Sequence, residues 1–202
     1  MILNKENIEQ LESRYRTSFI NSLAGFRQAV CVGTKSKEGV SNLAIFNSLI
    51  HLGADPALYG LISRPHTVQR DTLQNILDTS VYTLNYLHYL EYEKAHQTSA
   101  RYAGHVSEFD QVGLKEIYHP SFDAPFVESA LVKIAMNLED TLPIPQNNTL
   151  LIVGRIAHIE LEDKWVGNDG FVRLSEAGVL ICQGLDAYFV SESVGRLPYA
   201  KP

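Results

Sequence analysis

Hydrophobic positions recur every three or four residues over 4–24, which predicts an amphipathic helix. Asn4 is suited to cap its N-terminus. One face of this helix carries Ile8, Leu11, Tyr15, Phe19 and Leu23. From Phe26 the hydrophobic residues come instead in short runs rich in β-branched side chains, which is typical of strands. The change of pattern predicts an N-terminal helix over 1–25 and a separate β-rich domain over 26–202.

The β-rich part alternates strand-like runs with turn signals. Strands are predicted at 29–34, 40–52, 57–63, 81–85, 130–139 and 149–162, and a last strand or buried segment at 178–183. A short helix is predicted over 67–77, with Asp71 or Thr72 as its cap, and two more within 87–113, the second around 107–113. Many short strands with a few surface helices favour a barrel over a doubly wound sheet. The fold class is therefore expected to be mainly β.

Composition and charge argue against several classes of function. The 202 residues carry a formal charge of −6, which argues against tight nucleic-acid binding. The two cysteines, Cys31 and Cys182, sit in apolar runs and fit a reducing compartment better than a disulfide scaffold. No apolar run approaches the roughly 20 residues of a membrane span, and the N-terminus has no signal-peptide pattern. A cytoplasmic protein without membrane partners is expected.

Common catalytic motifs are absent from the sequence. It has no G-x-G-x-x-G dinucleotide fingerprint, no G-x-x-x-x-G-K-[ST] phosphate loop and no H-E-x-x-H, C-x-x-C or G-x-S-x-G. The seven histidines are scattered without metal-ligand spacing. No metal site is predicted, and no catalytic residue is assigned.

The most informative segment runs from Thr34 to Asn85. It contains, in order, SNLAIFNS (41–48), DPALYGLISRP (55–65) and RDTLQNILDTSVYTLN (70–85). These residues resemble the flavin-reductase-like FMN-binding split-barrel family, particularly its flavoredoxin-type members. That family carries an N-x-A-P-[FY]-S-type strand, an acidic-Pro turn and an apolar strand ending near an Arg. A basic-Asp-Thr helix start and a strand ending in Asn follow, as they do here.

Later segments extend the resemblance over most of the chain after Gly25. They are HVSEFDQVGL (105–114), DAPFVESALVKIAMNLE (123–139), LLIVGRIAHIELED (150–163) and GRLPYAKP (195–202). Two departures matter. Ile45 stands where the family has a proline that shapes a strand close to the flavin ring, and the family's following serine position reads Asn47-Ser48. Contacts to the ring are therefore expected to differ.

The resemblance implies a Greek-key split β-barrel that forms a homodimer, with FMN held at the subunit interface. It implies an NAD(P)H-dependent flavin reductase or a related oxidoreductase, with NADH or NADPH as co-substrate. Two alternatives stay open. One is an FMN electron carrier without NAD(P)H activity, and the other is a split-barrel ligand-binding module that has lost FMN.

Candidate cofactor-binding residues fall into two groups. Ser63, Arg64, Arg70 and Thr72 bracket a strand end and a helix start, where charge-assisted donors suit a phosphate. Asn42, Asn47, Ser48 and the strand's backbone amides are candidates for the polar edge of the flavin ring, with Ala44 on the same face as Asn42. The alternatives are solvated loop charges with a plain helix cap for the first group, and turn residues for the second.

The aromatic residues are assigned structural roles. Tyr86, Tyr89 and Tyr92 have helical spacing, which predicts core or dimer-interface positions. Trp165 lies in a polar segment and is expected to be a surface anchor. The alternative for Trp165 is a cap over the flavin of a neighbouring subunit.

Overall fold

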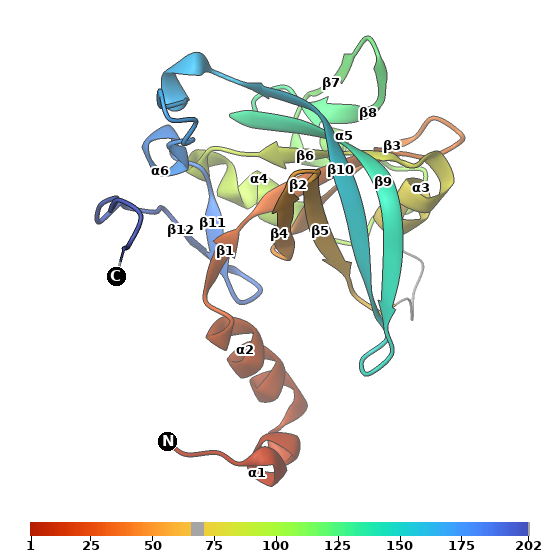
Figure 1. The fold of residues 1–202 in the computed structure, drawn as a ribbon. Helices are drawn as coiled ribbons and strands as arrows, with labels where there is room; N and C mark the ends of the chain where they lie inside the picture. The colour runs from red at the N-terminus through yellow and green to blue at the C-terminus, as the bar shows by residue number, and fades with distance from the viewer. Residues whose placement is uncertain (66–70, 202) are drawn as a thin grey trace.

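The computed structural model describes residues 1–65 and 71–201, and its main feature is a curled antiparallel sheet (Figure 1). The seven strands run in the order β3-β2-β6-β9-β10-β5-β4. Their bounds are β2 (Val30–Lys35), β3 (Ser41–Phe46), β4 (Leu49–Ala54), β5 (Ala57–Ser63), β6 (Val81–Tyr86), β9 (Val132–Ile144) and β10 (Thr149–Leu161). The edge strands β3 and β4 are consecutive in the chain, separated only by Asn47 and Ser48. The sheet must therefore curl until its two edges meet, and this confirms the predicted split barrel.

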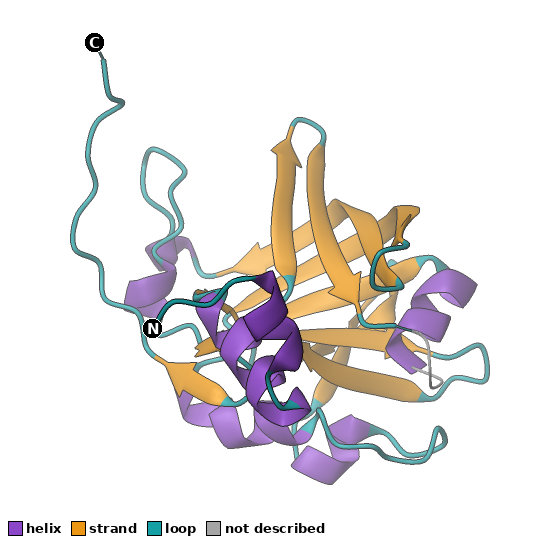
Figure 2. Ribbon diagram, turned by 90° about the horizontal axis from the view of Figure 1, so that it is seen from below, coloured by secondary structure: helices purple, strands orange, loops and turns teal. Residues whose placement is uncertain are grey.

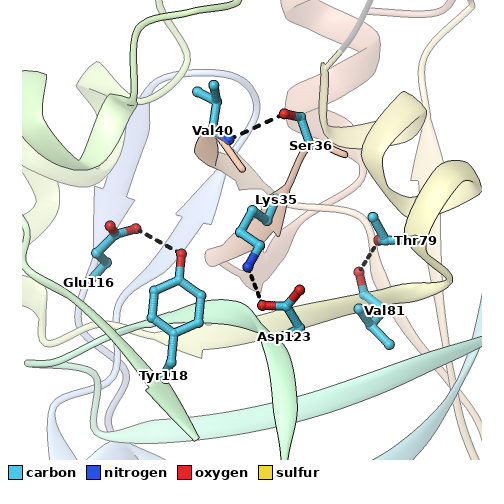
Figure 3. Close-up of polar contacts among 8 residues, drawn as sticks. All are labelled: Lys35, Ser36, Val40, Thr79, Val81, Glu116, Tyr118 and Asp123. Carbon is cyan, nitrogen blue, oxygen red and sulfur yellow. Dashed lines mark hydrogen bonds and ion pairs between the residues drawn. The ribbon is translucent and has the colours of Figure 1, made fainter. Parts of the chain in front are cut away.

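Two smaller sheets accompany the barrel. β1 (Phe26–Gln28), β11 (Ile181–Gln183) and β12 (Ala187–Phe189) form a three-stranded sheet, and β7 (Glu116–His119) pairs with β8 (Phe122–Val127). Figure 3 shows how this last hairpin is fastened to the end of β2. The Lys35 ammonium forms an ion pair with Asp123 and lies 5.2 Å from the centre of the Tyr118 ring.

Strand β2 is buried on both faces, which explains its continuous apolar run. Val30 and Val32 point into the main cluster inside the barrel, with Leu84, Ile134 and Met136 among its other members. Ala29 and Cys31 alternate to the opposite face and join a second cluster. That cluster includes Leu43, Phe109 and Cys182, so it packs the outer face of β2 and β3 against the helical segments.

The helical N-terminal region differs from the prediction in one respect. The single helix expected over 4–24 is two helices, α1 (Lys5–Gln10) and α2 (Ser13–Leu23), because Leu11 takes an extended conformation with ψ 141°. Asn4 caps α1 as predicted, accepting a hydrogen bond from the Asn7 backbone amide at 2.9 Å. Neither helix has a buried residue, and Figure 1 shows both projecting below the barrel.

The other helices are short and lie between strands or after them. They are α3 (Asp71–Thr79), η1 (Tyr89–Glu91), α4 (Tyr92–Gln97), α5 (Glu108–Val112), η2 (Asp163–Trp165) and α6 (Leu174–Ala177). The start of the helix predicted over 67–77 lies outside the described residues. Within the described ranges, no helix is both long enough and apolar enough to cross a bilayer.

Two further predictions need correction. The strand expected over 40–52 is broken at Asn47 and Ser48, which form the junction between β3 and β4. Trp165 is not a surface anchor, because it is half-buried against the main core cluster and its indole nitrogen is fully covered. Of the three tyrosines, Tyr86 is buried in that core, whereas Tyr89 and Tyr92 remain partly exposed.

Candidate functional site

A pocket of about 570 Å³ runs along β3, and we call it the β3 trough. Its walls come from the junction of α2 and β1, from β3, from the end of β5, from the start of α3, and from the loop after α4. The lining residues are Asn21, Arg27, Asn42, Ala44, Ile45, Phe46, Asn47, Ser48, Ile62, Ser63, Arg64, Asp71, Thr72, Leu73, Thr98, Ser99, Ala100, Arg101, Tyr102, Glu108 and Ile152. Seven of the eight predicted site residues lie in it, and the eighth, Arg70, lies outside the described residues.

The trough follows β3, and side-chain hydrogen bonds mark its two ends. At one end Asn42 donates hydrogen bonds to the hydroxyl oxygens of Thr34 (3.1 Å) and Thr72 (3.0 Å), which ties β3 to the start of α3. At the other end Asn47 donates to the Gly184 carbonyl (2.6 Å) beside β11. A strand advances about 3.3 Å per residue, so the two ends are roughly 16 Å apart.

The phosphate-site candidates keep unused donors. Ser63 is buried, and within the described part of the chain its hydroxyl makes only a long hydrogen bond of 3.4 Å to the Arg64 carbonyl. Thr72 accepts a hydrogen bond from Asn42, and no described residue accepts a hydrogen bond from its own O–H. Arg64 is exposed and makes no ion pair with any described residue. The described part of this group can therefore offer two hydroxyl donors and one guanidinium to an anion.

The ring-edge candidates, by contrast, are mostly engaged within the protein. Both N–H groups of the Asn42 amide are taken by threonine hydroxyls. The Ser48 hydroxyl donates to the Ile62 carbonyl (3.0 Å) and accepts from the Ile62 amide (3.2 Å), which joins the strand junction to β5. Their side chains shape the trough, so donors toward a ligand there fall to the second Asn47 N–H and to backbone amides.

Several lining residues were not predicted from the sequence. Arg27, Arg101 and Glu108 reach the trough from β1, from the loop after α4 and from α5. Arg27 and Arg101 carry no local motif that sets them apart from surface arginines. Glu108 does have a signal, since it belongs to the HVSEFDQVGL segment that resembles the family, and its helix position points it at β3.

Glu108 is a buried acid in this polar pocket. One of its carboxylate oxygens accepts a hydrogen bond from the Leu43 backbone amide at 3.0 Å, which anchors α5 on β3. Burial raises the pKa of the Glu108 carboxyl, the nearby Asp71 raises it further, and the Leu43 hydrogen bond opposes both. The trough therefore holds a carboxyl group whose proton is retained to higher pH than in an exposed glutamate.

The charge of the trough differs from that of the chain. The described lining includes three arginines against two carboxyl groups, whereas the whole chain carries −6. None of Arg27, Arg64 and Arg101 forms an ion pair with a described residue. Unpaired arginines in a concave site make it favourable for anions.

A comparison with known domain families shows to which family this chain belongs. The model of the flavin reductase like domain matches residues 23–174, about three-quarters of the chain. The chain belongs to this family. The match runs from the end of α2 to the start of α6, so it includes every described residue that lines the trough except Asn21. The resemblance seen in the sequence is thereby confirmed.

Solved structures agree on the fold. A Shewanella frigidimarina protein assigned as a flavin reductase with a split barrel domain is 42% identical, with a TM-score of 0.95, covering 99% of this chain and 100% of that one. Component B of nitrilotriacetate monooxygenase from Bacillus cereus is 17% identical, with a TM-score of 0.85 and 98% of each chain covered. An FMN-binding protein from Thermus thermophilus is 18% identical, with a TM-score of 0.73, covering 88% of this chain and 93% of that one. The last two show a shared fold.

Proposed function

We propose that this chain binds FMN in the β3 trough and acts as an NAD(P)H-dependent flavin reductase or a close oxidoreductase relative. The observation that carries the proposal is the convergence of three donors on one pocket of a flavin reductase like domain. They are the Arg64 guanidinium and the Thr72 hydroxyl, whose donors no described residue takes up, and the Ser63 hydroxyl, which makes only a long bond among the described residues. The FMN-binding protein with the same fold supports the choice of flavin.

The donor set of the trough fits a flavin mononucleotide. A phosphate dianion needs charge-assisted donors, and Arg64 with the Ser63 and Thr72 hydroxyls can supply them. The flat ring needs an apolar wall, which Ile45, Phe46, Ile62, Leu73 and Ile152 provide. Two or three charge-assisted contacts plus burial of the ring are enough for a micromolar Kd, about −8 kcal/mol.

The protein's own contribution is binding, orientation and exclusion of water. FMN when bound would supply the redox chemistry, taking up hydride from a nicotinamide. The apolar side chains along β3 would keep solvent from the ring, and the β3 backbone amides with Asn47 would face its polar edge. Such a step needs no acid–base pair or nucleophile from the protein, which agrees with the lack of catalytic motifs in the sequence.

A homodimer is part of this proposal. Large apolar side chains remain exposed on the N-terminal helices and β1, with Leu23 67% and Phe26 62% accessible. Both lie beside the α2–β1 wall of the trough, where Arg27 and Asn21 reach the pocket. A second copy that covered this surface would close the open side of the flavin site.

The deciding experiment is an anaerobic titration. Purified protein is loaded with FMN, its visible spectrum is recorded, and NADH or NADPH is added. The expected result is saturable FMN binding in the micromolar range, followed by bleaching of the flavin band by at least one dinucleotide. Failure to bind FMN contradicts the cofactor assignment. Binding without bleaching by either dinucleotide, but with bleaching by dithionite, favours an electron carrier.

A further inference from the structure

Arg27 lies at the end of the trough farthest from the start of α3. It pairs with Cys182 across β1 and β11, and residues directly opposite in an antiparallel pair share a face. Asn47, which directly follows β3, donates a hydrogen bond to the carbonyl of Gly184, the residue directly after β11. Asn42 at the other end of β3 is bonded to Thr72. Arg27 and Thr72 therefore occupy opposite ends of the trough.

One bound FMN does not account for both ends. It has a single phosphate, and the donors suited to that phosphate include Thr72 at the α3 end. The length of β3 between Asn42 and Asn47, roughly 16 Å, is well beyond the reach of one arginine side chain. A phosphate held near Thr72 would leave the Arg27 guanidinium without an anionic partner.

No described residue near Arg27 serves as a partner for its guanidinium. It makes no hydrogen bond and no ion pair with the described residues, although the chain is acidic overall. Its neighbours on the same strand are otherwise occupied: Phe26 packs edge-on against Phe189, and Gln28 donates to backbone carbonyls. Arg27 thus presents its guanidinium to a pocket that also holds Arg64 and Arg101, and none of the three arginines is paired with a described residue.

Two anions could meet Arg27 there, the reduced flavin ring or a charged group on the second substrate. Arg27 is an exposed side chain at the margin of the trough. Water screens the charge of an exposed guanidinium, so its effect on a ring deeper in the pocket would be small. A group that arrives from solvent, in contrast, can meet the guanidinium directly, and its planar fork suits the paired oxygens of a phosphate or carboxylate.

We propose that Arg27 anchors an oxyanion group, phosphate or carboxylate, of the second substrate that enters the β3 trough beside FMN. This inference rests on the proposed function and names a specificity-determining residue for it. A phosphate would come from a nicotinamide dinucleotide, whereas a carboxylate would come from an organic acid. In either case Arg27 contributes to recognition of the second substrate and not to retention of FMN.

The test measures binding without turnover. Wild-type protein, Arg27→Ala, Arg27→Lys and the control Arg14→Ala are loaded with FMN and titrated calorimetrically with NADP⁺, NAD⁺ and benzoate. Arg14 is an exposed arginine on α2 that does not line the trough. Its variant therefore removes one positive charge, as Arg27→Ala does, without changing the trough. We expect Arg27→Ala to weaken the recognised anion about tenfold or more, Arg27→Lys to weaken it less, and Arg14→Ala to leave it unchanged.

FMN affinity, measured by fluorescence quenching, separates the outcomes. It should stay within about twofold of wild type in Arg27→Ala. Loss of FMN in this variant, equal behaviour of the Arg27 and Arg14 variants, or a wild-type protein that holds FMN but binds none of the three anions would each overturn the inference. A wild-type protein that does not bind FMN would instead refute the proposed function itself. If Arg27→Ala does not fold, Arg27→Lys carries the test, since it keeps the charge and removes the fork.

Discussion

Polar side chains in the trough divide into those already hydrogen-bonded within the chain and those with donors to spare. Asn42 and Ser48 use every side-chain N–H or O–H to join neighbouring elements. Arg64 and the Thr72 hydroxyl keep donors that no described residue takes up. Loss of a residue in the first group should therefore act mainly on stability, and loss of one in the second mainly on ligand affinity.

Arg64→Ala tests the phosphate assignment. The substitution removes one charge-assisted donor, which is worth about 1.5 kcal/mol at the lower end of the usual range because Arg64 is exposed. FMN should bind about tenfold more weakly, whereas riboflavin, which has no phosphate, should bind unchanged. Fluorescence quenching with both ligands measures the effect, and Arg14→Ala is the control. Equal weakening of both ligands would show that Arg64 does not contact the phosphate.

Glu108→Gln tests the buried carboxyl group. Its pKa is raised above 4.5 in the folded protein, mainly by burial, so the folded state binds this proton more tightly than the unfolded chain does. Ionisation of Glu108 therefore lowers stability as pH rises from the unfolded pKa through the folded one. Glutamine keeps the acceptor for the Leu43 amide and cannot ionise.

The Gln variant should accordingly unfold at higher urea concentration than wild type at pH 7. This difference should shrink as pH falls below 4.5, where Glu108 becomes protonated in both states. Urea unfolding at several pH values provides the measurement. A variant less stable than wild type at pH 7 would contradict this expectation. It would mean that hydrogen bonds to the Glu108 carboxylate contribute more to stability than its burial costs.

At the scale of elements, β2 of the barrel and β8 of the adjoining hairpin approach each other closely. Gly33 of β2 faces the Pro125 carbonyl and the Thr83 hydroxyl, which themselves share a hydrogen bond of 2.5 Å. A methyl group at Gly33 would collide with the Pro125 backbone and lie 2.5 Å from the Thr83 hydroxyl. Because a backbone carbonyl cannot rotate away, the two strands would have to separate.

Gly33→Ala should lower the free energy of unfolding by about 3 kcal/mol, the upper end of the usual cost of overpacking. Gly104→Ala is the control, since its nearest neighbours are the Asp71 carboxylate oxygens at 3.8 and 3.9 Å and its backbone does not need glycine. Urea unfolding of both variants measures the difference. Similar stability in the two would show that β2 and β8 are not held this closely.

The whole molecule exposes apolar surface at its two ends. Figure 1 shows the N-terminal helices below the sheet, and Figure 2 shows the segment after β12 running away from it as an extended chain. Leu23, Phe26, Val194 and Leu197 are all more than half exposed. Light scattering after size-exclusion chromatography should give about twice the 22.6 kDa mass of one chain. A monomer at micromolar concentration that still bound FMN tightly would contradict the dimer.

The sequence alone determined the local elements and the class of fold. Alternating and continuous apolar runs predicted strands such as 57–63 and 81–85 almost to the residue, because side-chain burial on a strand follows its period of two. It also identified β3 and the segment after β5 as the candidate site, since their motifs are contiguous in the chain. The break at Leu11 was missed because apolar spacing continues through it, while the backbone turns there.

Only the tertiary structure decided which residues share the trough. Arg27 lies more than 70 residues before Arg101 and Glu108 in the chain, and no local pattern marks their meeting. Likewise, Asn42 and Ser48 looked like free donors until the folded chain supplied Thr72 and Ile62 as their partners. Pockets and hydrogen-bond partners depend on contacts between distant segments, and these arise only when the sheet curls and brings its edges together.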